Sequence, residues 1–193
     1  MTAEARSPLA GRGEDLAGIA ATTDGAVVVE HVPFLAQVDV RLDPEAVARS
    51  PVPLPTRPNT AWEEGSRAAL WLGPDEWVVL GPPATGPEIV AEFHRALEGV
   101  VHRSVVDVSA NRVALELGGS RAKDVLAKGC GLDLDPRAWT AGRCAQTLLA
   151  RVPVILQERA DTTGVLIRPS YSNYLVDWLL EAVVEFRGAH GSD

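Results

Sequence analysis

The best candidate for a catalytic residue in this sequence is an aspartate. Asp107 stands inside the apolar stretch VVDVSANR, close to Asn111 and Arg112. An aspartate can act as a general base when a substrate pocket surrounds it and raises its pKa. The alternative, which we favour, is that Asp107 lies on a solvated face or fastens the turn that follows its strand.

A cysteine is the second candidate. Cys130, in AKGCGL, falls at the C-terminal end of an expected helix. The thiolate is the nucleophilic form of cysteine, and the negative end of a helix dipole disfavours it. We therefore interpret Cys130 as a structural thiol. Cys144 is the other cysteine, and two such residues fit a reducing compartment and form no disulfide framework.

Motifs for metal or nucleotide binding are absent from the sequence. A zinc site normally needs about four ligands at close spacing, whereas the histidines stand singly at 31, 94, 102 and 190. His94 follows an apolar helical stripe and is best interpreted as a boundary residue rather than a ligand. No GxSxG, HExxH or Walker loop occurs, and the Gly-x-Gly at 11–13 precedes any expected strand. We expect no catalytic, cofactor-binding or metal-binding residue in this chain.

Composition narrows the class of protein further. The chain has 193 residues, 46% of them hydrophobic, and a formal net charge of -8. That length and apolar content suit a folded domain with a substantial core. The negative charge and the lack of a Lys/Arg run argue against nucleic acid or a membrane as partner. The N-terminus carries no apolar targeting segment, so we expect a cytoplasmic protein.

The first part of the chain predicts strands separated by irregular segments. Residues 1–24 mix charges with Gly and Pro and are expected to form a flexible N-terminal arm. Strands are expected at 27–32 and 35–42, joined by Pro33-Phe34. The connection 43–60 contains five prolines, which forbid a continuous helix or a central strand. This connection either separates two subdomains or drapes over a surface.

A hairpin is expected in LWLGPDEWVVL, residues 70–80. Pro74 and Asp75 suit the central positions of a turn, so strands 68–72 and 76–80 should pair antiparallel. Both faces of these strands carry apolar bulk, which favours a hairpin buried on both sides. The alternative is that one of its aromatic side chains remains partly exposed at a subunit contact.

The remaining segments alternate helices and strands. Helices are expected at 86–99, 120–129 and 170–186, the last with a wide apolar face that should lie on a sheet. A second hairpin is expected over 103–119, and 143–159 with 163–169 should supply three strands. This order predicts an α+β fold, with mixed or antiparallel sheets and helices packed to one side. We expect a single domain over 25–187, composed of two halves, about 25–100 and 101–187.

Two tryptophans are candidates for a subunit interface. Trp62 and Trp139 are both flanked by polar or turn-forming residues, and aromatic side chains contribute strongly to interfaces. The N-terminal arm and the connection 43–60 lack the periodicity to fold alone. We hypothesise that these two segments also lie along partner chains.

Several segments together resemble a known family. They are RSPLAG (6–11), LWLGPDEWVVLGPP (70–83), VVDVSANRVALELGG (105–119), the long block VLAKGCGLDLDPRAWTAGRCAQTLLARVPVIL (125–156) and YLVDWLLEA (174–182). The chain resembles the gamma subunit of the bacterial heterotetrameric sarcosine oxidases, and the block 125–156 is the specific part. The resemblance implies a fold similar to the folate-binding aminomethyltransferase domain of the glycine-cleavage T-protein.

The resemblance also implies a function at the level of a complex. Such complexes oxidise the N-methyl group of sarcosine, yielding glycine, hydrogen peroxide and formaldehyde, or methylenetetrahydrofolate when folate is present. FAD, covalently held FMN, NAD, tetrahydrofolate and zinc are associated with the alpha, beta and delta subunits. The family therefore offers no catalytic residue to carry over, and this chain is expected to be a non-catalytic subunit.

Two alternatives remain at this stage. Related stand-alone folate-binding proteins carry a Lys-Gly-Cys motif that continues into an aromatic residue, Thr, Gly, Gln and Glu. Here Lys128-Gly129-Cys130 continues into Gly131-Leu132-Asp133 and lacks those polar residues. A stand-alone folate-binding T-protein-like protein is the runner-up interpretation, and a free-standing interaction protein is the third.

Overall fold

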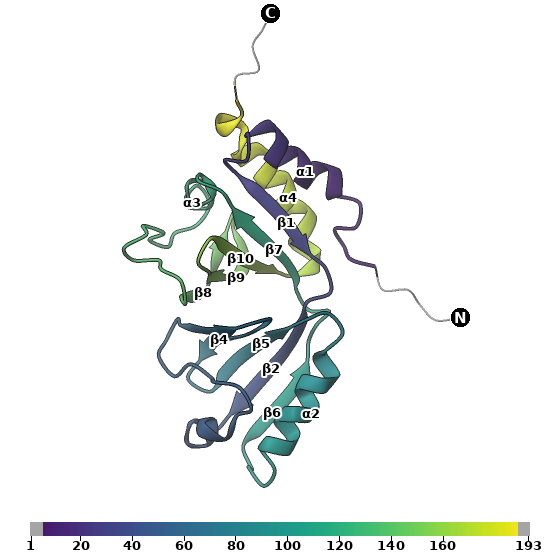
Figure 1. Cartoon of the computed structure of the whole chain (residues 1–193), viewed down its shortest axis with the longest axis vertical. Coiled ribbons are helices and arrows are strands. Elements are labelled where there is room, and N and C mark those ends of the chain that lie inside the picture. The colour runs from purple at the N-terminus through teal and green to yellow at the C-terminus, as the bar shows by residue number, and fades with distance from the viewer. Residues whose placement is uncertain (1–5, 189–193) are drawn as a thin grey trace, which may run out of the picture.

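The computed structural model describes residues 6–188, and these form two antiparallel sheets that lie one above the other (Figure 1). Each sheet has five strands. Sheet A has the order β1 (Val28–Val32), β7 (Val113–Gly118), β10 (Thr162–Ile167), β9 (Val152–Glu158) and β8 (Cys144–Leu149). Sheet B has the order β3 (Ala61–Glu64), β4 (Arg67–Gly73), β5 (Glu76–Gly81), β2 (Ala36–Leu42) and β6 (Arg103–Asp107).

Helices cover the outer faces of the sheets. Sheet A packs against α1 (Gly13–Thr22), α3 (Ala122–Ala127) and α4 (Pro169–Ala182), and sheet B packs against α2 (Gly86–Ala96). Figure 1 shows α1 and α4 side by side on sheet A and α2 along β6. Two short 3-10 helices follow β2 and α4, at Pro44–Arg49 and Val184–Phe186. The arrangement confirms the α+β prediction, with both sheets antiparallel and the last helix lying on a sheet.

The hairpin β4–β5 is buried on both of its faces, as predicted. Leu70 and Val78 pack between the two sheets, whereas Trp77 and Val79 pack on the opposite face against α2. Side chains alternate between the faces of a strand, so an apolar residue at nearly every position gives a strand with two buried faces. This hairpin therefore contributes to both hydrophobic layers of sheet B.

The chain crosses between the sheets twice, which corrects the prediction of a hairpin over 103–119. β6 pairs with β2 in sheet B, whereas β7 pairs with β1 and β10 in sheet A. The loop between β6 and β7 is held to β2, where the Val108 N–H donates to the Gln37 carbonyl and Gln37 Nε2 donates to the Arg112 carbonyl. The two expected halves thus exchange strands, because β1 joins sheet A and β6 joins sheet B.

The N-terminal segment also differs from the expected flexible arm. Residues 13–22 form α1, and Leu9, Leu16 and Ile19 are buried against sheet A. Arg12 Nη2 lies 2.6 Å from Asp177 Oδ1 and ties the start of α1 to α4. The apolar residues at 16 and 19 share one helical face, a short signal that the surrounding Gly and charged residues obscure. Residues 1–5 lie outside the described chain.

The proline-rich connection drapes over the outer face of sheet B, which is one of its two predicted arrangements. Val52 and Leu54 are buried there, and Trp77 Nε1 donates to the Pro55 carbonyl at 2.7 Å. The alternation of proline with apolar residues fixes an extended backbone and points two side chains inward. The connection therefore packs on its own chain, and its place along a partner chain stays a hypothesis.

Candidate functional site

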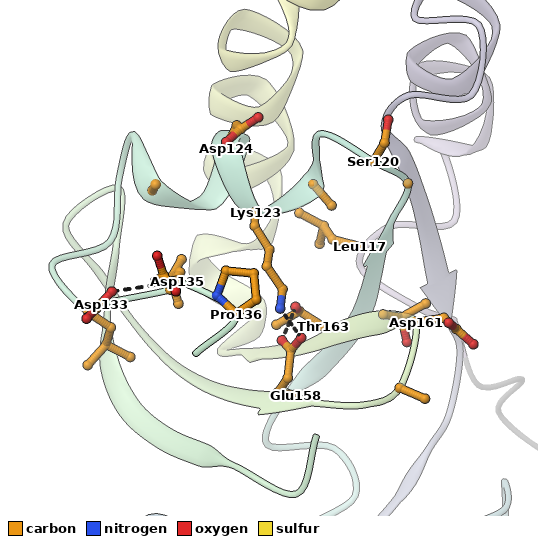
Figure 2. Close-up of a pocket in the computed structure, with 17 residues that line it drawn as sticks. Leu117, Ser120, Lys123, Asp124, Asp133, Asp135, Pro136, Glu158, Asp161 and Thr163 are labelled. Atoms are coloured by element: carbon orange, nitrogen blue, oxygen red, sulfur yellow. Dashed lines mark hydrogen bonds and ion pairs between the residues drawn. The ribbon is translucent and has the colours of Figure 1, made fainter. Parts of the chain in front are cut away.

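A cavity of about 590 Å³ is the largest described hollow of this surface. It lies between α3, the loop 132–136 that follows α3, and the adjoining ends of β9 and β10 (Figure 2). The chain forms it because β9 and β10 run antiparallel and α3 crosses above their shared end. Charged side chains are concentrated here, so this cavity is the main candidate for a functional site.

An ion pair with a buried carboxylate forms the floor of the cavity. Lys123 Nζ lies 2.6 Å from Glu158 Oε1, and Thr163 Oγ1 donates to Glu158 Oε2 at 2.6 Å. Figure 2 shows Lys123 reaching from α3 onto these two residues. The Glu158 side chain is only 5% exposed, and both of its oxygens have a partner. A carboxylate held this way locks α3 to the sheet and is not available as a general base.

The mouth of the cavity is acidic, and three of its carboxylates, those of Asp124, Asp133 and Asp135, are engaged locally. Asp133 Oδ1 accepts from the Asp135 N–H at 3.0 Å, and Asp124 Oδ2 lies 2.9 Å from Arg121 Nη1. Hydrogen bonds from the Arg137 side chain lower the pKa of Asp135. Within residues 6–188 no group of three or more His, Cys, Asp and Glu side chains is arranged to hold a metal ion. The cavity can hold a small polar molecule.

Asp107 takes the structural role that we favoured. Its exposed carboxylate accepts from Ser109 N at 3.0 Å and from Ser109 Oγ at 2.5 Å, and so fastens the turn after β6. The same carboxylate lies against Gly86 at the start of α2, where a Cβ atom would collide with it. Asp107 is therefore a link between the turn and α2, and it lines none of the described cavities.

The Lys128-Gly129-Cys130 segment is used for packing. Lys128 Nζ contacts the Ala182 carbonyl and Glu185 Oε1, and it lies 4.6 Å from the centre of the Phe186 ring. A Cβ atom at Gly129 would lie 2.7 Å from the Trp178 ring. These contacts join the end of α3 to α4 and to the 3-10 helix Val184–Phe186 that follows it. The segment thus holds α3 against the rest of the fold, as the Lys123 ion pair does.

Both cysteines are free and buried. Cys130 is buried, and its Sγ lies 3.9 Å from Thr147 Oγ1. Cys144 is fully buried between the sheets, and burial raises the pKa of its thiol to about 11. Its Sγ donates to the Thr60 carbonyl at 3.2 Å. Neither thiol has the exposed, electropositive setting of a reactive cysteine.

The described histidines do not lie together at one site. His94 is exposed on α2, as expected of a boundary residue. His31, on β1, is half-buried, and its Nε2 lies 3.0 Å from Ser7 Oγ. Burial lowers the pKa of His31, which favours the neutral ring. His190 lies outside the described residues.

The two predicted interface tryptophans have different environments. Trp62 is half-buried on the edge strand β3 and remains accessible. Trp139 is only 4% exposed and packs in the core beneath sheet A's helices, which corrects the prediction that it is a surface aromatic. The turn 135–139 folds the ring inward, since the Ala138 and Trp139 N–H groups both donate to the Asp135 carbonyl. The polar residues beside Trp139 indicate that the backbone lies near the surface, but they do not indicate which way the ring points.

The sequence interpretation missed Lys123, Glu158 and Thr163. One signal could have drawn attention to Glu158, which ends the strongly apolar strand sequence VPVILQE. A carboxylate at the end of such a strand is expected to be buried and paired. Its partner could not be identified, because Lys123 comes from a helix that is distant in sequence.

The comparisons with known proteins agree on one family. A family model described as "Sarcosine oxidase, gamma subunit family" matches residues 52–185. A relative from Arthrobacter sp, named "Sarcosine oxidase subunit gamma", is 36% identical over 173 residues, which cover 86% of this chain and 84% of the relative. A protein of the same name from Corynebacterium sp. (strain P-1) is 38% identical over 175 residues, again 86% of this chain and 84% of the relative.

Solved structures give the same result. A chain of the heterotetrameric sarcosine oxidase from Corynebacterium sp. U-96, in complex with pyrrole 2-carboxylate, matches with a TM-score of 0.86 and 32% identity, covering 97% of this chain and 99% of that chain. The glycine cleavage system aminomethyltransferase T from Bartonella henselae matches with a TM-score of 0.68 and 13% identity, covering 90% and 56% of the respective chains. The second match shows the fold alone. On the family model and the relatives together, this chain belongs to the sarcosine oxidase gamma subunit family.

Proposed function

We propose that this chain is a non-catalytic gamma subunit that assembles with alpha, beta and delta subunits into a heterotetrameric sarcosine oxidase. One observation carries the proposal. The match to a chain of a heterotetrameric sarcosine oxidase extends over nearly the whole of both chains, at 32% identity and a TM-score of 0.86. That match over the full length of both chains supports a role as one subunit of such a complex.

The assembled complex oxidatively demethylates sarcosine to glycine, with hydrogen peroxide and formaldehyde or 5,10-methylenetetrahydrofolate as further products. The other subunits hold FAD, FMN, NAD, tetrahydrofolate and zinc. The chemistry-bearing side chains of this chain support that division. Glu158, Lys128 and Asp107 are each engaged in contacts that join elements of the fold. The complex works in the cytoplasm, and none of the described helices is long and apolar enough to cross a membrane.

We assign the cofactors to the other subunits, and two features of this chain support that assignment. Dinucleotide binding uses a glycine-rich turn between a parallel strand and a helix, and the described strands all pair antiparallel. The cavity between the two sheets has a volume of about 300 Å³, at the lower limit of roughly 300 Å³ for small-molecule sites. Arg159 lies there between Glu63 and Glu116 and is ion-paired with both. A stand-alone folate-binding role therefore has no support in this cavity.

Of the two tryptophans predicted to contact a partner, Trp62 is the one that is accessible at the surface. It is half-buried on β3, an edge strand of sheet B, so a partner chain could reach it. We assign it a place at a subunit interface, where a partly exposed indole gains most from being covered.

Affinity capture from the native host tests the proposal. The tagged chain is isolated, and the eluate is analysed for its subunits, its visible flavin absorbance and its sarcosine-dependent hydrogen peroxide production. A yellow, active eluate of four chains is the expected result. A colourless eluate that contains this chain alone would overturn the proposal.

A further inference from the structure

A second cavity, of about 410 Å³, lies where the chain crosses between the sheets. Its wall combines the N-terminal segment, the link between β1 and β2, and the loop between β6 and β7. Most of the wall is apolar, with Pro8, Val32, Phe34, Leu35 and Val113 among its residues. We call it the crossover cavity. None of the structural ion pairs described above lies in it.

An arginine without a direct hydrogen-bonded partner distinguishes the crossover cavity. Arg112 lines it and is half-buried, and burial lowers the pKa of its guanidinium. The carboxylates of Asp39 and Glu76 lie near enough to raise that pKa in part. Among residues 6–188, however, no side chain forms a direct ion pair or hydrogen bond with the guanidinium, whereas the half-buried Arg12 and Arg67 are each paired with a carboxylate. A cation withdrawn from water costs free energy unless an anion compensates it. Asp39 and Glu76 supply part of this compensation from a distance, and a bound carboxylate would supply the direct contact.

Other charges near the cavity strengthen its preference for an anion. Arg6 lines the same cavity, and Arg168 lies close enough to Arg112 to lower its pKa further. His31 and Ser7 also line it, but their hydrogen bond holds the N-terminal segment against β1. The positive charge therefore comes from arginines, on a chain whose net charge is -8. Such a local reversal of charge selects an acidic partner by electrostatic complementarity.

An exposed aromatic residue completes the cavity. Phe34, a large apolar side chain in the wall of the cavity, is 49% exposed to solvent. Its φ of +58° lies in the left-handed region, which bulky residues seldom occupy. Backbone strain of this kind persists where the surrounding structure holds it, and it is concentrated at binding sites. Aromatic residues and arginine are also the residues enriched at protein interfaces.

We infer that the crossover cavity receives a segment of another subunit, which places an apolar side chain against Phe34 and Leu35 and a carboxylate on Arg112. The inference rests on the proposed function and specifies one of its contact surfaces. An apolar wall with arginines at its side fits a leucine-like or aromatic side chain beside an aspartate, a glutamate or a C-terminal carboxylate. Charge-assisted pairing with an arginine fork then orients the segment.

A competition for assembly tests the inference. Wild-type and variant chains with different tags are co-expressed with the other three subunits of the host, and the purified complexes are analysed by mass spectrometry for the share of each chain. Arg112→Gln removes the charge and keeps a long polar side chain. Phe34→Asn removes the ring and suits the left-handed backbone. Arg95→Gln, at an exposed position on α2, removes the same charge away from the cavity and is the matched control.

The expected result is a share about tenfold or more below wild type for both Arg112→Gln and Phe34→Asn, as for residues at the centre of an interface. The share of Arg95→Gln should equal that of wild type. Thermal unfolding of each isolated chain shows that the variants are folded. If either cavity variant enters the complexes as well as wild type, the inference is wrong. If wild type itself enters none, the proposed function fails, and this inference fails with it.

Discussion

Lys123 and Glu158 show how charged residues serve this fold. Their ion pair joins α3 to β9, and Thr163 on β10 satisfies the second carboxylate oxygen. Glu158 has the least exposed side chain of any carboxylate in the described ion pairs. Its charge is therefore compensated mainly by protein groups and little by water. The pair is a structural connection at the floor of the largest cavity.

Replacing Lys123 should lower the stability of the protein. Lys123→Met leaves Glu158 buried without its cation, and we expect the free energy of unfolding to fall by about 2 kcal/mol, less than for a fully buried pair because Lys123 is partly exposed. The double variant Lys123→Met/Glu158→Gln, which removes both charges, should recover more than half of the loss. Urea unfolding of the three proteins measures these values. Equal losses in the single and double variants would contradict a specific ion pair.

Cys144 gives a prediction about reactivity. With its pKa raised to about 11, the thiol is fully buried and weakly acidic. At pH 8 roughly one thousandth of it is thiolate, against roughly a quarter for an ordinary cysteine. Iodoacetamide should therefore leave Cys144 unmodified in the native protein and modify it in urea, as peptide mass spectrometry can measure. Rapid native modification of Cys144 would show that the thiol is accessible.

At the scale of elements, local patterns were readable from the sequence and partner choice was not. The β4–β5 hairpin was predicted correctly because its turn residues and its alternation lie within a few positions of one another. The hairpin over 103–119 was wrong because β6 and β7 pair with strands far away along the chain. Helix α1 was missed because two buried residues on one face are a weak signal. The inward direction of Trp139 depends on a turn, and the ion pair of Lys123 depends on tertiary packing.

The junction between α3 and β8–β9 gives a test at this scale. Gly129→Ala would place a methyl group 2.7 Å from the Trp178 ring and 2.9 Å from the Ala150 nitrogen. We expect a loss of about 2 kcal/mol in the free energy of unfolding, as for an overpacked core. Gly131→Ala is the matched control, since no atom lies within 4 Å of its added methyl. It should change stability by less than about 0.5 kcal/mol. Equal stability of both variants would refute the packing role of the segment 128–130.

At the scale of the whole molecule, strand exchange links the two sheets. β1 belongs to sheet A although it precedes all of sheet B, and β6 belongs to sheet B although it follows α2. A third hydrophobic layer fills the space between the sheets. Neither expected half, 25–100 or 101–187, therefore contains a complete sheet. This arrangement supports the proposal that 25–187 forms one domain.

A single cooperative unfolding transition follows from that arrangement. Tryptophan fluorescence, with Trp77 in sheet B and Trp139 beneath the helices of sheet A, and far-UV circular dichroism should give coincident urea unfolding curves. Two separated transitions would show that the sheets unfold independently.

The most direct test of the central claim is the rate of sarcosine turnover per flavin in the captured complex. The claim is that the chain assembles with the oxidase and contributes no chemical group. Complexes that carry Asp107→Asn together with Cys130→Ala in this chain should turn over sarcosine within about twofold of wild type, since both residues have structural contacts only. Loss of a general base would instead lower the rate by about a hundredfold or more. A loss of that size, at unchanged flavin content, would contradict the account.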